Sequence, residues 1–224
     1  MKLLVTDYDN TLELHYDFTD NDNILKRNII AIDEFMKNNI CCIATGRHFD
    51  AIYKTLIEKN INFNYLCANN GAELYDKDYK LLFCLPIDEY DFRILSLLKE
   101  DIFFRHPCDS KMITSANLYI YDLDNFKKMK IFLDNNLKES FIEYKFPKIK
   151  IINKNCDKLN TIDIIKKIEN IDDDKIYVIG DDINDIQMII KYHGFSLVTA
   201  KQNVKDVSAK IYNELNELIY DINT

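Results

Sequence analysis

Near its N-terminus the chain carries a short apolar run, Leu3 to Val5, that leads into two acidic residues, Asp7 and Asp9. A short, branched and continuous apolar run indicates a strand buried on both faces, which is typical of a parallel sheet covered by helices. Asp7 would lie where this strand leaves the sheet, and ligands bind at that edge in open α/β folds. The alternative is a plain turn, because Asp and Asn favour turns.

Strands and helices alternate through residues 1–86. Apolar runs at 40–44 and 65–68 predict two more buried strands, and apolar residues at helical spacing predict helices over about 21–39 and 49–57. Residues 73–85 have the pattern of two further strands around a turn. The order strand, helix, strand, helix, strand is that of a doubly wound unit.

A second unit interrupts this winding. Its pattern is helix, two strands, helix, two strands, with helices expected at 88–99 and 124–137 and strands at 102–105, 117–121, 141–146 and 149–152. We expect Asp124 to cap the second of these helices. The winding resumes with a helix just after Lys158 and strands at 176–179, 195–198 and 209–212. We therefore expect a doubly wound, mostly parallel α/β core of residues 1–86 and 156–224 and an inserted α+β cap of residues 87–155.

Composition excludes several classes of function. The net charge of -8 argues against a nucleic-acid partner. No apolar stretch approaches the roughly 18 residues of a membrane span, and no signal-type segment is present, so we expect a cytoplasmic protein. The six cysteines form no CxxC pair, which argues against a zinc site or disulfides. Oligomeric state leaves no trace in the sequence.

Polar residues follow three of the predicted parallel strands. They are Asp7 and Asp9, then Thr45, then Asp181, Asp182 and Asp185. Since the carboxyl ends of parallel strands share one edge of the sheet, these side chains are expected to converge. Two like charges at about 4 Å cost roughly 4 kcal/mol at an effective dielectric of 20, and a hard cation removes that cost. Aspartate oxygens with room for water suit Mg²⁺, which usually bridges to a phosphate.

The neighbouring residues fit a phosphoryl group. Lys158 offers a compact positive charge for a phosphoryl oxygen, Thr45 offers a hydroxyl and Gly46 permits a close backbone approach. Asp182 has the character of a turn residue more than of a ligand. Asn184 and Asp185 have an alternative role as helix caps, and Arg47 could pair with an acid instead of the substrate.

Four motifs together resemble the haloacid dehalogenase-like superfamily, and among its branches the Cof-type phosphatases with a large α/β cap. They are DYDNT at residues 7–11, ATGR at 44–47, Lys158, and GDDINDIQM at 180–188; NNGA at 69–72 is also similar to this branch. The resemblance covers core and insertion alike.

The resemblance implies a role for each matching residue. Asp7 would be the nucleophile that forms an aspartyl-phosphate, and Asp9 the general acid and base. Thr45 and Lys158 would hold phosphoryl oxygens, with Gly46, Arg47 and Asn184 at the substrate. Asp7, the Asp9 carbonyl and Asp181 would bind Mg²⁺, and Asp185 would support that metal site.

The activity expected from this resemblance is Mg²⁺-dependent hydrolysis of a small phosphorylated metabolite, such as a sugar phosphate. Two alternatives stay open. One is a phosphotransferase of the phosphohexomutase type, and the other is a non-catalytic phospho-acceptor module like a receiver domain. The DxDxT spacing and the inserted segment argue against the receiver.

Overall fold

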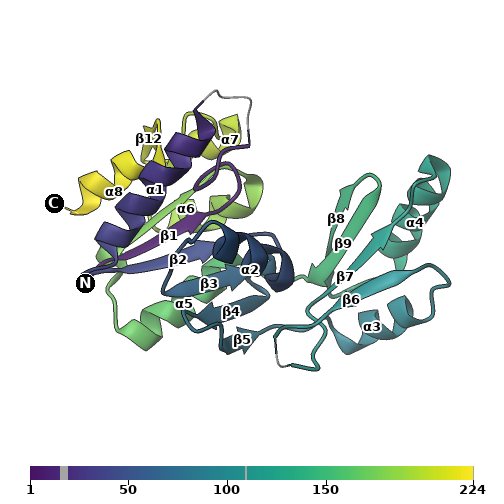
Figure 1. Ribbon diagram of the computed structural model, residues 1–224. Coiled ribbons are helices and arrows are strands. Elements are labelled where there is room, and N and C mark those ends of the chain that lie inside the picture. The colour runs from purple at the N-terminus through teal and green to yellow at the C-terminus, as the bar shows by residue number, and fades with distance from the viewer. Residues whose placement is uncertain (16–19, 109, 224) are drawn as a thin grey trace.

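The computed structural model describes residues 1–15, 20–108 and 110–223. They form an eight-stranded sheet and a separate four-stranded sheet, each with its own helices (Figure 1). In chain order the elements are β1 (Leu3–Asp7), α1 (Asn21–Phe35), β2 (Ile40–Ala44), α2 (Phe49–Glu58), β3 (Tyr65–Ala68), β4 (Glu73–Asp76), β5 (Leu81–Cys84), α3 (Glu89–Ser96), β6 (Ile102–Arg105), β7 (Ser115–Tyr119), α4 (Leu123–Asn136), β8 (Ser140–Lys145), β9 (Lys148–Asn153), α5 (Lys158–Glu169), β10 (Ile176–Gly180), α6 (Ile186–Lys191), β11 (Phe195–Leu197), α7 (Gln202–Lys205), β12 (Lys210–Tyr212) and α8 (Leu215–Asn223).

The larger sheet has the strand order β12-β11-β10-β1-β2-β3-β4-β5. Its strands from β12 to β3 are parallel, and β4 and β5 add an antiparallel edge. β1 is central, paired with β10 on one side and β2 on the other. The ends of β1 and β10, which lead into the acidic turns, therefore lie side by side, although Asp7 and Gly180 are 173 positions apart in the chain.

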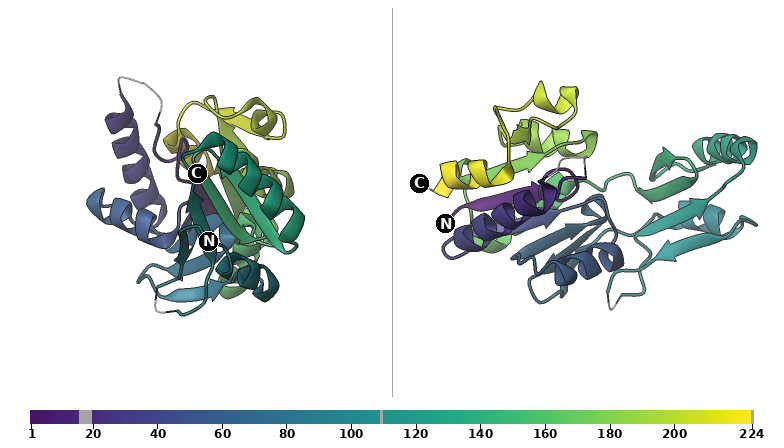
Figure 2. Two further views of the ribbon diagram at one scale, coloured as in Figure 1. Left: turned by 90° about the vertical axis from the view of Figure 1, so that its right-hand side faces the viewer. Right: turned by 45° about the horizontal axis from the view of Figure 1, so that its top comes forward.

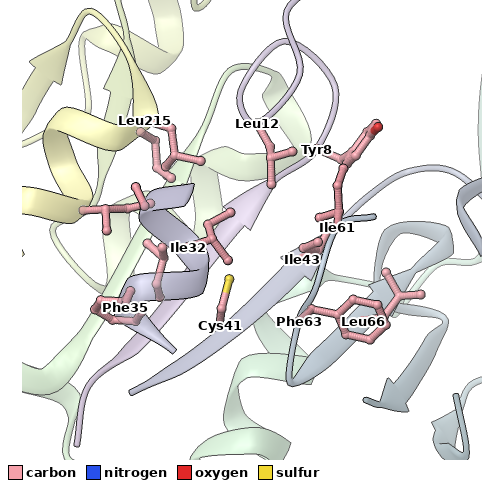
Figure 3. Close-up of a cluster of buried hydrophobic side chains, with 14 of the residues drawn as sticks. Tyr8, Leu12, Ile32, Phe35, Cys41, Ile43, Ile61, Phe63, Leu66 and Leu215 are labelled. Carbon is pink, nitrogen blue, oxygen red and sulfur yellow. The ribbon is translucent and has the colours of Figure 1, made fainter. Parts of the chain in front are cut away.

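Helices cover both faces of this sheet. Leu4 and Cys41 pack with α1, α2 and α8 on one face, as Figure 3 shows in part. Their neighbours Leu3 and Val5 pack with α5, α6 and α7 on the other. All five residues of β1 are buried. Each such Leu, Ile or Val contributes about 2 kcal/mol when removed from water, which explains why these strands are continuous apolar runs.

The smaller sheet is antiparallel, in the order β6-β7-β9-β8. One face packs against α3 and α4 through side chains such as Leu95, Phe126 and Leu133. The views in Figures 1 and 2 place this unit at one end of the molecule, with the N-terminus and α8 at the other. The carboxyl ends of the parallel strands point toward it (Figure 1).

The predicted fold class is confirmed, and some predicted bounds are wrong. The helix expected at 88–99 ends at Ser96, because Leu97 is 83% exposed and adds nothing to the core. The strand expected at 117–121 spans residues 115–119, since Ser115 already pairs with both neighbouring strands.

Two predicted helix starts also need correction. Asp122 rather than Asp124 caps α4, accepting a hydrogen bond from the Asn125 amide. Lys158 does not precede its helix but is the first residue of α5. Within the described residues, no helix is long and apolar enough to cross a membrane. The boundaries of the inserted unit at 87 and 155 stay a prediction.

Candidate functional site

Lys158 is the most buried cation of the region, with 1% of its surface exposed. Its Nζ donates to Asp7 Oδ1 at 2.5 Å and to Asp185 Oδ1 at 2.7 Å. Burial alone would lower the pKa of Lys158, but the two carboxylates raise it above its ordinary value. A buried ammonium is tolerated only with such partners, so Lys158 joins the start of α5 to the ends of β1 and β10.

The turn before β4 allows α5 to start at this place. Gly71 has a φ of 90°, and a Cβ on it would lie 2.2 Å from the Asp157 carbonyl oxygen. Only glycine combines this backbone conformation with so close an approach. Asp157 then caps α5 by accepting a hydrogen bond from the Leu159 amide, which fixes the first turn and with it Lys158.

Asp7, Asp181 and Asp185 form a compact acidic cluster. Each offers a carboxylate oxygen, and these atoms lie within 4.8 Å of one another. Burial raises the pKa of Asp7 well above its ordinary value, with Lys158 opposing the shift and Asp185 and Asp181 adding to it. Burial, and then the charges of Asp185 and Asp182, raise the pKa of Asp181 to about 6.

This donor set fits a divalent cation. Three ionised carboxylates and one ammonium leave two negative charges in a buried space, and the raised pKa values of Asp7 and Asp181 reflect their cost. The donors are all oxygen atoms, which suit a hard cation such as Mg²⁺.

Both carboxylate oxygens of Asp185 accept hydrogen bonds from the protein itself. Oδ1 accepts from Lys158, and Oδ2 accepts from the backbone amides of Asp181 and Asp182 at 3.1 and 3.2 Å. Gly180 makes room for this carboxylate, since a Cβ there would lie 2.3 Å from Asp185 Cγ. Asp185 therefore holds the turn and Lys158 in place, which leaves Asp7 and Asp181 as the better cation ligands.

Asp182 behaves as a turn residue. Its Oδ1 accepts from the Ile183 amide at 2.5 Å and from Lys201 Nζ at 2.6 Å. The capping motif of Asp182 and Asp185 starts the short 3-10 helix Ile183–Asp185.

Asp9 lies outside the acidic cluster and pairs with Arg47. Arg47 Nε donates to Asp9 Oδ2 at 3.0 Å and Nη2 donates to Oδ1 at 2.5 Å, so the pair is bidentate. His15 Nε2 also contacts Asp9 Oδ1, at 2.9 Å. Of the two predicted roles for Arg47, the structure shows the pairing with an acid, and that acid is the predicted general acid and base.

The turn after β2 is held from several sides. Thr45 is fully buried, and its hydroxyl accepts from the Arg47 amide at 3.1 Å. A Cβ on Gly46 would lie 2.9 Å from Asn70 Oδ1, so the turn packs closely against Asn70. Asn184 donates to that same Asn70 oxygen at 2.9 Å. Asn70 thus links the turn after β2 to the one after β10.

A cavity of about 790 Å³ lies over these turns. Its lining includes the predicted residues Asp7, Asp9, Gly46, Arg47, Asp181 and Asn184. Thr45, Lys158 and Asp185 are buried and are absent from its lining. The other wall comes from the β8–β9 hairpin, through Phe141, Glu143, Lys145, Phe146, Lys148 and Lys150.

The sequence predicted both strands of the hairpin but not that they line the site, and it gave no site role to His15 or Asn70. Arg105, His106 and Lys111, which also belong to the inserted unit, do not line this cavity. Arg105 instead lies 3.7 Å from Asp50 of α2. The alternation of apolar and polar residues from Ile142 to Lys145 was the available signal, because it marks a strand with one solvated face.

The family of haloacid dehalogenase-like hydrolases matches residues 4–122 and 106–217 of the chain. The chain belongs to this family. It is therefore an enzyme of the hydrolase class, as the four motifs predicted.

Solved structures with the same fold cover nearly the whole of this haloacid dehalogenase-like hydrolase. A protein from Thermotoga maritima has a TM-score of 0.80 at 17% identity, over 99% of this chain and 96% of its own. A haloacid dehalogenase-like hydrolase from Bacteroides thetaiotaomicron has a TM-score of 0.77 at 16% identity, over 99% of each chain. A sugar phosphatase of subclass IIB has a TM-score of 0.74 at 15% identity, over 100% and 99%.

One relative by sequence comes from Mycoplasma capricolum. It is an uncharacterized protein, 24% identical over 264 residues, and the match covers 98% of this hydrolase and 99% of the relative.

Proposed function

We propose that this hydrolase is a Mg²⁺-dependent phosphatase of a small phosphorylated metabolite, such as a sugar phosphate. The observation that carries the proposal is the position of Asp7. Its carboxylate lines the cavity at the end of the central strand, beside Asp181, with a buried ammonium on Oδ1. Lys158 is the only donor to the Asp7 side chain among the described residues, so Asp7 Oδ2 is not engaged by a protein donor there.

The chemistry requires two displacements at phosphorus. In the first, an Asp7 oxygen attacks phosphorus, the bond from phosphorus to the ester oxygen breaks, and Asp9 gives that oxygen a proton. In the second, Asp9 takes a proton from water, the water oxygen attacks phosphorus, and the bond to Asp7 breaks. Inorganic phosphate leaves, and both carboxylates return to their starting state.

Asp7, Asp181 and the backbone carbonyl of Asp9 are the groups that would hold Mg²⁺. The ion would offset the negative charge of the phosphoryl group. Asp185 supports this site through Lys158 and through the backbone of Asp181 and Asp182. Thr45 fixes the turn that brings Gly46 and Arg47 to the cavity, and Asn184 lies opposite them.

The volume of the cavity supports a small substrate. Its volume of about 790 Å³ lies within the range of roughly 300–1,000 Å³ for small-molecule sites. The hairpin forms part of its wall, so the reaction would take place with limited access of bulk water. The sugar phosphatase that shares the fold makes sugar phosphates the first compounds to test. The predictions of a cytoplasmic location and of no nucleic-acid partner are part of this proposal.

Replacing the nucleophile tests the proposal directly. We expect Asp7→Asn to lower kcat for phosphomonoesters at least about 1,000-fold, because the amide cannot take the phosphoryl group. The measurement is phosphate release from a panel of sugar phosphates, with and without Mg²⁺. Asp172→Asn, which changes an exposed acid paired with Lys175, is the matched control and should retain full activity. Undiminished turnover by Asp7→Asn would end the proposal.

Product analysis separates the two alternatives. A mutase would convert a sugar monophosphate into its isomer when a bisphosphate primer is added, without net release of phosphate. A phospho-acceptor module would be labelled once per chain without multiple turnover. Continuous phosphate release at more than one equivalent per chain is the result that the phosphatase requires.

A further inference from the structure

The β8–β9 hairpin presents one polar face and one apolar face. Residues paired across antiparallel strands point to the same side, and the pairs here are Glu143 with Lys150 and Lys145 with Lys148. All four of these charged residues line the cavity. The alternating residues Ile142, Tyr144, Ile149 and Ile151 pack toward the hydrophobic cluster of the smaller sheet. The cavity therefore has a wall with three lysines and one glutamate.

Lys150 brings this wall into contact with the core. Its side chain is nearly buried, with 6% of its surface exposed, and its Nζ donates to the Gly46 carbonyl at 2.6 Å. An ammonium has three donor hydrogens, so the bond to Gly46 leaves two of them for other partners. Burial lowers the pKa of Lys150 to about 8, with Glu143 opposing the shift, and a bound anion would compensate this loss of solvation.

The charges of the cavity are separated by element. The acids Asp7, Asp9, Asp181 and Asp182 come from the core turns, where the cation Arg47 is paired with Asp9, whereas the three lysines come from the hairpin. In the described part of the chain, neither Lys145 nor Lys148 forms an ion pair with a carboxylate. One glutamate against three lysines leaves a positive surplus on the hairpin, although the whole chain has a net charge of -8. This surplus is concentrated at the cavity, where it can act on a ligand.

We propose that the hairpin is an anion subsite, in which Lys148 and Lys150, with Lys145 at its edge, bind a second anionic group of the substrate. The group is a phosphate or a carboxylate on the part of the molecule that leaves after phosphoryl transfer. This inference rests on the proposed phosphatase function and specifies its substrate class.

The reacting phosphoryl group does not itself account for the hairpin lysines. On the core side it would lie against Asp7 and Asp181, the residues that fit a cation, and against the turn at Gly46, while Lys158 is buried and holds Asp7. The cavity, at about 790 Å³, is also far larger than one phosphate needs, since even a water molecule in the liquid takes only about 30 Å³. Phe141 and Phe146 line it beside the lysines and offer apolar contact for a carbon skeleton between two charged ends.

Three related substrates test the subsite. Glucose 6-phosphate has an uncharged end opposite its phosphate, 6-phosphogluconate has a carboxylate there, and glucose 1,6-bisphosphate has a second phosphate. The measured quantity is kcat/KM for phosphate release, expressed as a ratio to glucose 6-phosphate. We expect the better of the two doubly anionic substrates to exceed glucose 6-phosphate by about 10- to 100-fold, as charge-assisted hydrogen bonds typically contribute. This ratio is well above the factor of two that a second reactive phosphate supplies statistically.

Variants of Lys148 assign the effect to the hairpin. Lys148→Met should reduce the ratio at least about fivefold, and Lys148→Arg should retain most of it because the charge is kept. Lys127→Met removes an exposed lysine from α4, outside the lining of the cavity, and should leave the ratio unchanged. The ratio compares kcat/KM for two substrates on the same protein, so any loss of folded enzyme cancels. A purely structural role of Lys148 would therefore leave the ratio unchanged.

The outcomes distinguish the anion subsite from the phosphatase function on which it rests. Turnover of all three substrates at similar kcat/KM, or a ratio unaffected by Lys148→Met, overturns the anion subsite and leaves the phosphatase intact. Turnover of no phosphomonoester overturns the phosphatase and the subsite together. A preference that depends on Lys148 and favours 6-phosphogluconate assigns a carboxylate, and one that favours the bisphosphate assigns a phosphate.

Discussion

At the scale of single residues, Arg47 decides where the Asp9 carboxylate lies. Its guanidinium holds both Asp9 oxygens, and its carbon Cζ lies 4.9 Å from the centre of the Tyr8 ring. A lysine offers a point charge and cannot reproduce this planar, bidentate contact. The position of the proton donor in the proposed reaction is therefore set by a neighbour that does not transfer the proton itself.

We expect Arg47→Met to lower kcat about 10- to 100-fold, because misplacing a proton-transfer group is costly even when it is still present. Arg47→Lys should recover only part of this loss. Steady-state kinetics with the best phosphomonoester measures both. Arg93→Met is the control, since Arg93 pairs with Glu89 in an exposed contact on α3. An unchanged kcat for Arg47→Met would show that Asp9 is positioned without Arg47.

The acidic residues of the site could be predicted from the sequence, whereas the contacts that they form in the structure could not. Asp7 and Asp181 stand at the ends of apolar runs, so the fold class alone places them at one edge of the sheet. The pairing of Lys158 with Asp7 depends on where α5 starts relative to β1, 151 residues away in the chain. Arg47 could be read as a ligand for substrate or for an acid, and only the geometry shows that it holds Asp9.

At the scale of elements, Lys150 connects strand β9 to the turn after β2. This contact lies inside the protein, and burial lowers the pKa of Lys150 to about 8 from 10.5. Between these two values the unfolded chain binds more protons than the folded one. The free energy of unfolding therefore rises with pH in this window, and the cost of the buried charge is present in full below it.

We expect the titration of Lys150 to raise the free energy of unfolding by about 2 kcal/mol between pH 7.5 and pH 10, at 1.36 kcal/mol per pKa unit. Urea denaturation of the wild type and of Lys150→Met at both pH values measures it as a difference, which cancels the titration of other groups. Lys127→Met is the control for loss of an exposed lysine. If the difference between the wild type and Lys150→Met is the same at both pH values, the ammonium is not desolvated in the folded state.

Elements of the core were easier to predict than those of the cap. β1, β2 and β3 are buried on both faces, so unbroken apolar runs mark them, and β2 and β3 have the predicted bounds. β8 has one face toward the cavity and one toward α4, which gives a weaker alternating pattern. That pattern identifies a strand, but it does not say that its polar face meets the ends of the core strands.

At the scale of the whole molecule, the site is assembled from two separately packed units. The larger sheet has its own hydrophobic clusters on both faces, and the smaller sheet has a third. The cavity is lined by polar side chains of the smaller sheet and by the turns that follow the strands of the larger one. The core thus supplies the acids of the proposed reaction, and the cap supplies the cations proposed to select the substrate.

Through the acidic cluster, the proposed metal binding would stabilise the folded chain as a whole. Without a cation, burial raises the pKa values of Asp7 and Asp181, and repulsion between them and Asp185 adds to the shift. A cation that binds the folded state alone stabilises it by about 2.7 kcal/mol at 100 times its Kd. For a chain of this size that corresponds to a rise in melting temperature of about 5–10 °C.

We therefore expect millimolar Mg²⁺ to raise the melting temperature of the wild type by about 5–10 °C over the value in EDTA at matched ionic strength. Asp181→Asn should lose this rise and should melt at or above the wild-type temperature in EDTA, because it removes one of the repelling charges. Asp173→Asn, in an exposed pair with Lys166, should behave as the wild type. An equal Mg²⁺ response in wild type and Asp181→Asn would place the cation elsewhere. A lower melting temperature for Asp181→Asn in EDTA would mean that this carboxylate stabilises the metal-free fold and is not held there for a cation.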